Sequence, residues 1–131
     1  MSEAMPRRFP RLVAGMVFLA ALVLSSPLKA QDAAKIAQGD SLFNGKQMGA
    51  CWACHAKGGK GTSLAPNLGD KEWLNIDGSE EAIKGVITNG IPKPKKAKAP
   101  MPPMGGAKLT PEQVDDLAAY VFSLRNAGKK K

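Results

Sequence analysis

The run Cys51-Trp52-Ala53-Cys54-His55 constrains this chain more than any other feature, because it contains both of its cysteines and its one histidine. In a C-x-x-C-H run the two thiols can add to the two vinyl groups of haem, and the adjacent imidazole reaches the iron. The run therefore predicts one covalently attached haem c. Cys51 and Cys54 would form the thioether bonds, and His55 would be the proximal iron ligand.

Three other uses of the two cysteines have less support. A thioredoxin-like redox pair normally lies in a β-α-β context, which this sequence lacks. A disulfide between cysteines separated by only two residues would close a small, strained ring. A zinc site needs further cysteine or histidine ligands, and the chain has none. The sequence therefore favours covalent haem attachment.

The first thirty residues have the order of a secretory signal peptide. Three arginines precede an apolar run over residues 12–24, and the small residue Ala30 follows Pro27. The run is shorter than the roughly 20 residues that a membrane-spanning helix needs. We expect cleavage after Ala30 and export to the periplasm by the general secretory route. The alternative is an uncleaved membrane anchor, and the paired arginines suggest twin-arginine export, although the residues after them fit that signal poorly.

Residues 31–131 would then form the mature protein, a single monohaem domain that is soluble and has no membrane span. The formal charge of +8 falls to +5, because residues 1–30 carry four basic residues and one acidic residue. That charge lies in two lysine clusters, at residues 93–98 and 129–131. Export and the lack of a base-stacking platform argue against a nucleic-acid partner.

Helical patterns occur at three places in the mature chain. Residues 33–48 have apolar side chains at helical spacing. Residues 79–89 begin with a serine N-cap and stop at Gly90, and the helix that starts after Thr110 begins with a capping box and a proline. Residues 70–74 could add one helical turn. The helices therefore number three to four.

Glycine and proline dominate the segments between these helices. Residues 58–69 are rich in glycine, and residues 92–106 contain five prolines, which remove backbone hydrogen-bond donors. No segment alternates as a strand does, so we predict an all-α fold. A chain with few short helices and long loops has too little core of its own, and we expect the haem to complete it.

The sixth iron ligand follows partly by elimination. With one histidine, the chain cannot supply a second imidazole, and methionine is the usual alternative in electron-transfer cytochromes. Met48 lies too close to the haem run to reach the opposite face of the ring. Met101 and Met104, about fifty residues downstream in a loop stiffened by proline, both remain candidates. A lysine from residues 93–98 is a minor option.

Five further stretches extend the pattern on both sides of the haem run. They are Gly39–Phe43, Ala65–Leu68, Met101–Gly106, Leu109–Gln113 and Leu117–Val121. Together with the haem run, this ordered set resembles class I cytochrome c in its bacterial monohaem form, over nearly all of the mature chain. The resemblance implies the class I cytochrome c fold, whose first and last helices cross at right angles, here with Gly39 against Tyr120.

The resemblance also implies roles for single residues. The Pro66 carbonyl would accept a hydrogen bond from the ring of His55 and fix its orientation. Met101, which begins an M-P-x-x-G-G stretch, would be the iron ligand in preference to Met104. Trp73 resembles an aromatic that packs near the haem edge, although plain core packing explains it equally well.

Two axial ligands would leave no vacant iron position, so the resemblance implies outer-sphere one-electron transfer and no enzymatic activity. We expect a monomeric, soluble periplasmic carrier for redox proteins such as an oxidase, reductase or dehydrogenase. Lys93, Lys95, Lys96 and Lys98 would steer it onto an acidic docking surface, or they form a solvated basic loop. The alternatives are a dedicated electron acceptor of a periplasmic dehydrogenase and a haem sensor or peroxidase with a labile sixth ligand.

One stretch is similar to a different branch of cytochromes. Residues 65–74 resemble the cytochrome domains attached to cbb-type haem–copper oxidases. Such domains have a membrane anchor, and the mature chain predicted here has no apolar run of that length. This difference favours a soluble shuttle.

Overall fold

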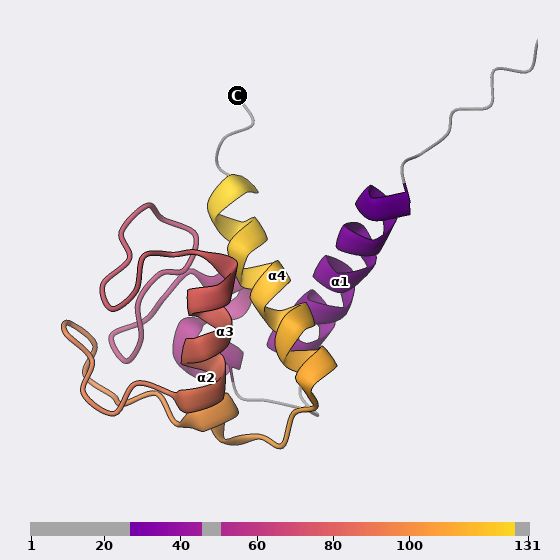
Figure 1. Ribbon diagram of the computed structural model, residues 1–131. Coiled ribbons are helices and arrows are strands. Elements are labelled where there is room, and N and C mark those ends of the chain that lie inside the picture. The colour runs from indigo at the N-terminus through magenta and orange to yellow at the C-terminus, as the bar shows by residue number, and fades with distance from the viewer. Residues whose placement is uncertain (1–26, 46–50, 128–131) are drawn as a thin grey trace, which may run out of the picture.

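The computed structural model describes residues 27–45 and 51–127, and within these ranges the fold is all-α, as predicted (Figure 1). Helices and short 3₁₀ turns alternate with loops, and the described residues contain no strand. The elements are α1 (Pro27–Asn44), α2 (Cys51–His55), η1 (Lys57–Gly59), α3 (Glu80–Asn89), η2 (Pro103–Gly106) and α4 (Pro111–Ala127). Three parts of the sequence analysis lie outside the described residues: most of the predicted signal peptide, Met48 and the basic tail 129–131.

Helix α1 packs against α4, and a glycine makes the close contact possible (Figure 1). A Cβ atom on Gly39 would collide with the carbonyl oxygen of Asp116 and would lie 2.6 Å from the Cβ of Tyr120. The two backbones therefore touch only because residue 39 has no side chain. Beside this point the ring of Phe43 lies 5.4 Å from that of Tyr120, between ring centroids. The contact of Gly39 with Tyr120 agrees with the expectation from the sequence.

Asn44, at the end of α1, connects the two helices to the start of the next segment. Its side-chain nitrogen donates to Asp40 Oδ1 at 2.6 Å and to the Tyr120 hydroxyl at 3.0 Å. Its side-chain oxygen accepts the backbone N–H of Gly58 at 3.0 Å. One amide thus fixes α1, α4 and the turn that follows α2 relative to one another.

The predicted helix caps are present. The hydroxyl of Ser79 accepts the N–H of Ala82 at 3.2 Å and starts α3. Before α4, Thr110 and Gln113 exchange backbone-to-side-chain hydrogen bonds of 2.9 and 3.2 Å, which is a capping box. The two helices then bury one apolar core with α1. Its buried members are Phe43, Ile83, Ile87, Val114, Leu117, Ala118, Tyr120 and Val121.

Two local predictions differ from the structure. Helix α1 begins at Pro27, six residues before the predicted start, and it continues through the expected cleavage position at Ala30. Residues 70–74 contain bends and no helical turn. The Asp70 carboxylate accepts the N–H of Glu72 at 3.0 Å, and this local bond competes with helix formation.

Among the described residues, we find no helix whose length and apolar character would suffice to cross a membrane.

Candidate functional site

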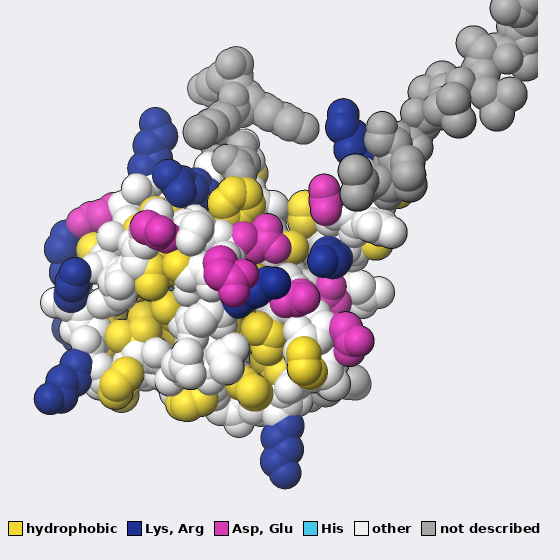
Figure 2. Space-filling view, viewed as in Figure 1, with side chains coloured by type: hydrophobic (Ala, Val, Ile, Leu, Met, Phe, Trp, Pro, Cys, Tyr) yellow, Lys and Arg dark blue, Asp and Glu magenta, His cyan; other side chains and the backbone are white. Residues whose placement is uncertain are grey.

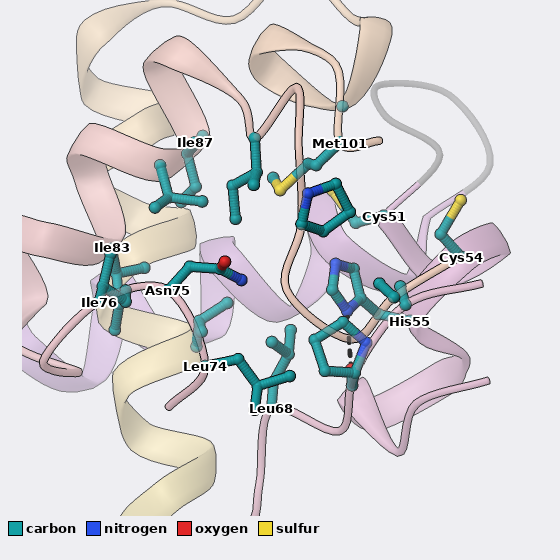
Figure 3. Close-up of a pocket in the computed structure, with 18 of the residues that line it drawn as sticks. Cys51, Cys54, His55, Leu68, Leu74, Asn75, Ile76, Ile83, Ile87 and Met101 are labelled. Atoms are coloured by element: carbon teal, nitrogen blue, oxygen red, sulfur yellow. Dashed lines mark hydrogen bonds between the residues drawn. The ribbon is translucent and has the colours of Figure 1, made fainter. Parts of the chain in front are cut away.

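Helix α2 places the three residues of the C-x-x-C-H run beside one cavity. Cys51, Cys54 and His55 all line it, and His55 is 9% exposed. The Nδ1 atom of His55 lies 3.0 Å from the carbonyl oxygen of Pro66 (Figure 3). A carbonyl can only accept, so Nδ1 carries the proton and the lone pair is on Nε2. This is the contact expected for Pro66.

The electrostatics of this helix suit a metal-binding imidazole and do not suit a redox-active thiol at Cys51. Burial lowers the pKa of His55, and the bond to Pro66 only partly opposes that effect, so the imidazole is neutral and able to bind a metal. Burial raises the pKa of the Cys51 thiol, with the neighbouring Cys54 adding to the increase. Thioredoxin-like pairs have a lowered cysteine pKa, so the shift at Cys51 argues against that alternative.

The cavity has a volume of about 160 Å³ and a mostly aliphatic wall. The aliphatic part of the wall comes from α3, α4 and the two long loops. The aliphatic members are Leu64, Leu68, Leu74, Ile76, Ile83, Val86, Ile87, Ile91, Leu109, Leu117 and Val121. An unfilled cavity of this size would cost about 4 kcal/mol at roughly 24 cal/mol per Å³. A large apolar group attached at α2 therefore fits this cavity.

Both candidate methionines line the cavity together with the residues of α2. Figure 3 shows the Met101 thioether turned into the cavity, while the His55 imidazole enters from α2. Met104 also lies in the wall, so cavity lining alone does not distinguish the two. Met104 has a positive φ of 53°, a backbone conformation that is uncommon for residues other than glycine. The structure thus brings a thioether and an imidazole from distant segments to the same cavity.

Trp73 also lines the cavity, and its indole nitrogen tests the fit of haem c. The Nε1 atom is buried and has no hydrogen-bond partner among the described residues. Gly78 packs against it, since a Cβ there would lie 2.5 Å from the Cδ1 atom of the indole. A buried donor without an acceptor costs about 1–3 kcal/mol. A haem carboxylate would supply the missing acceptor. Trp73 would then contact haem in two ways, with its N–H as a hydrogen-bond donor and with its ring as part of the cavity wall.

A segment that we call the strap, residues 92–100, forms one side of the cavity. Pro94, Ala97 and Ala99 are half-buried and line the cavity, while the four lysines of the strap are exposed. Sequence analysis found these lysines but missed the apolar side of the strap. The inward residues are separated by three and then two positions, which matches no helical or strand period.

Three contacts join the strap to the loop before α3. The N–H of Ala99 donates to the carbonyl of Leu64 at 3.3 Å. The N–H of Lys95 donates to the side-chain oxygen of Asn75, also at 3.3 Å. Lys96 forms an ion pair with Glu72. Asn75 itself points into the cavity (Figure 3) and was not predicted, because nothing in its local sequence marks it.

Comparison with known proteins agrees with this geometry. Residues 34–121 match the family described as Cytochrome C oxidase, cbb3-type, subunit III. The cbb3-type cytochrome c oxidase subunit CcoP of Rubrivivax gelatinosus is 37% identical over 116 residues, which are 87% of this chain and 34% of that protein. The chain therefore spans about a third of the length of that oxidase subunit.

Relatives of similar size are also found. Cytochrome c6 of Thermosynechococcus vestitus is 37% identical over 120 residues, which are 90% of this chain and 92% of the relative. Cytochrome c6 of Nostoc sp. is 35% identical over 116 residues, which are 87% of this chain and 90% of the relative. No solved structure matches the chain.

Proposed function

Because this chain belongs to the class I c-type cytochromes and to the family described as Cytochrome C oxidase, cbb3-type, subunit III, we propose that it is a soluble periplasmic one-electron carrier. Members of this family contain covalently bound haem c with iron. We propose that Cys51 and Cys54 attach it and that His55 and Met101 are the axial ligands. Residues 1–30 would be removed on export and residues 31–131 would form the carrier.

One observation carries the proposal. One apolar cavity is lined by two thiols, a neutral imidazole and the thioethers of Met101 and Met104, from segments about fifty residues apart in the chain. When bound, haem supplies one-electron oxidation and reduction at its iron. The aliphatic wall excludes water, and the bond from His55 to Pro66 holds the imidazole in one orientation. Side chains held in this way change little with oxidation state, which suits rapid electron transfer.

The oxidase-subunit relatives support a redox protein as the partner, and the strap supports an acidic surface on it. Lys93, Lys95 and Lys98 are exposed on the strap, whose other side lines the cavity. Figure 2 shows several lysines at the left-hand edge, where Figure 1 places the loops around the cavity, with a few acidic side chains among them, whereas acidic side chains predominate over α4 and α1. A positive surface beside a redox centre raises the rate of encounter with an acidic partner.

The ligand assignment is tested by Met101→Ala and Met104→Ala. We expect Met101→Ala to lose the weak far-red charge-transfer band that a thioether ligand gives ferric haem, to become high-spin and to have a lower reduction potential. Met104→Ala should keep the band. Loss of the band in Met104→Ala alone would reassign the ligand. A high-spin ferric spectrum in the wild-type protein would instead support a haem sensor or peroxidase.

The docking surface is tested with an anionic probe in place of the unidentified partner. The rate of oxidation by ferricyanide would be measured against ionic strength for Lys93→Gln/Lys95→Gln/Lys98→Gln. We expect a lower rate and a smaller salt dependence than in the wild type. The matched control replaces three exposed lysines elsewhere in the mature chain, Lys35, Lys57 and Lys108, and removes the same charge. Equal salt dependence in both triple variants would contradict a local role for the strap.

A further inference from the structure

The backbone of Met101 is held by the residues that directly follow α3. The N–H of Ile91 donates to the carbonyl of Met101 at 2.8 Å, and the N–H of Met101 donates to the carbonyl of Ile91 at 3.0 Å. This reciprocal pair is an isolated antiparallel bridge. It fixes both backbone groups of Met101 in a segment where five prolines leave few other donors.

Gly90 presses against the same segment from the end of α3. Its φ of 70° with ψ of −173° is a conformation that essentially only glycine adopts. A Cβ on Gly90 would collide with the carbonyl oxygen of Met101 and would lie 2.8 Å from Pro102 C and Pro103 N. The chain can therefore make the bridge to Met101 only if residue 90 has no side chain.

Helix α3 is itself well anchored, so it can serve as a fixed support. Ile83 and Ile87 are 3% and 7% exposed in the core, and both also line the cavity. Lys84 forms an ion pair with Asp115 of α4 at 2.7 Å. The N–H of Gly90 still bonds to Val86 of the last turn, at 2.7 Å, so the support continues to the point of contact with Met101.

We propose that Gly90 and Ile91 are positioning residues, which hold the Met101 thioether at the iron side of the cavity by clamping its backbone. This inference rests on the proposed function, in which Met101 is the axial ligand. A ligand whose backbone is already ordered loses less conformational entropy when it binds, so it competes better with a free ligand from solution. The strength of methionine ligation is thus set partly by the end of α3.

The test compares Gly90→Ala with Gly58→Ala in the haem-containing protein. Gly58 also has a positive φ, of 68°, but a Cβ there would meet no atom within 4 Å. Both variants place a side chain at a positive φ, but Gly58, with ψ of 17°, lies in the left-handed helical region that alanine tolerates better than the conformation of Gly90. Only Gly90→Ala also displaces Met101. We expect free imidazole to displace methionine from ferric haem about tenfold more readily in Gly90→Ala, and within about twofold of wild type in Gly58→Ala. The far-red thioether band should weaken only in Gly90→Ala.

Equal imidazole affinity in the two variants would overturn the inference while the band in the wild type still supported Met101 as a ligand. Absence of the band from the wild type would overturn the proposed function instead. If Gly90→Ala fails to fold, amide hydrogen exchange of the reduced wild-type protein decides. The clamp requires slow exchange at Ile91 and Met101, and exchange as fast as in an exposed loop would contradict it.

Discussion

The helix crossing of α1 with α4 and the strap over the cavity are built on opposite principles. At the crossing, backbone touches backbone at Gly39, and buried aromatic side chains surround the contact. The strap has half-buried alanines and proline toward the cavity, and a few long hydrogen bonds and an exposed ion pair join it to the neighbouring loop. The crossing is stabilised by the chain itself, whereas the strap needs a group in the cavity to pack against.

The comparison also separates two tasks of the fold. The crossing holds α1, α4 and the turn after α2 together through Asn44, and so fixes the position of His55. On the strap side of the cavity, the residue that follows α3, Ile91, holds Met101 at the cavity wall. Of the two axial ligands that we propose, His55 therefore depends on side-chain packing, and Met101 depends on backbone hydrogen bonds in a segment rich in proline.

The largest expected effect comes from preventing haem attachment with Cys51→Ala/Cys54→Ala. Without the group that fills the cavity, the chain should lose about 4 kcal/mol of stability, from about 160 Å³ of lost packing. The loss should be uneven. Hydrogen exchange should show the strap and the loop before α3 losing protection well before the crossing of α1 with α4.

The same experiment can also show that the strap and the crossing of α1 with α4 are not independent. A haem stain after denaturing electrophoresis confirms that the double variant carries no covalent haem. If its strap and its crossing then lost protection together, the two regions would form one cooperative unit. Cys51→Ala alone serves as a control, because it should retain a single thioether bond.

A smaller loss of stability is expected from Gly39→Ala, and it should be centred on the crossing of α1 with α4 instead of the strap. The new methyl group would overlap Asp116 and Tyr120, and overpacking of this kind costs about 1–3 kcal/mol. Chemical denaturation of the haem-containing protein measures it. The haem spectrum should change little, since the strap and Met101 are not touched.

Gly85→Ala is the matched control for this substitution. Gly85 lies inside α3 and a Cβ there would meet no atom within 4 Å. Alanine is the better helix former, so we expect the stability to rise by about 0.5 kcal/mol or more. A similar loss in both variants would mean that the close approach at Gly39 is not what makes that position sensitive.

The same division explains how much could be predicted from the sequence. Helix caps at Ser79 and Thr110 depend on residues three positions apart, and both were predicted correctly. The cavity-facing position of the C-x-x-C-H run followed from the chemistry of its residues. A local bond at Asp70 replaced the helical turn expected there, because a side-chain carboxylate close to the backbone competes with helix formation.

Features of the strap could not be predicted in this way. Its contacts join residues such as Ala99 and Leu64, or Lys95 and Asn75, that are twenty or more positions apart. Gly90 looks like an ordinary helix stop in the sequence, and its contact with Met101 appears only in the folded chain. Local patterns describe helices well and describe a segment held by distant partners poorly.

The smallest expected effect is that of Lys96→Gln, which removes the ion pair between the strap and Glu72. The two side chains are 65% and 62% exposed, and an exposed pair contributes at most about 1 kcal/mol because water and salt screen it. A double-mutant cycle with Glu72→Gln isolates the pair from other effects of each change. The coupling should fall further as salt is added.

Lys84 and Asp115 provide the internal comparison for this cycle. Their ion pair joins α3 to α4, and the side chains are less exposed, at 29% and 41%. We expect a larger coupling that is less sensitive to salt, because the pair is held by two packed helices. A coupling at Lys96 equal to that at Lys84 would mean that the strap is held as rigidly as the helices. The strap would then be ordered by its own contacts, and the packing provided by haem would be a smaller part of its stability than we infer.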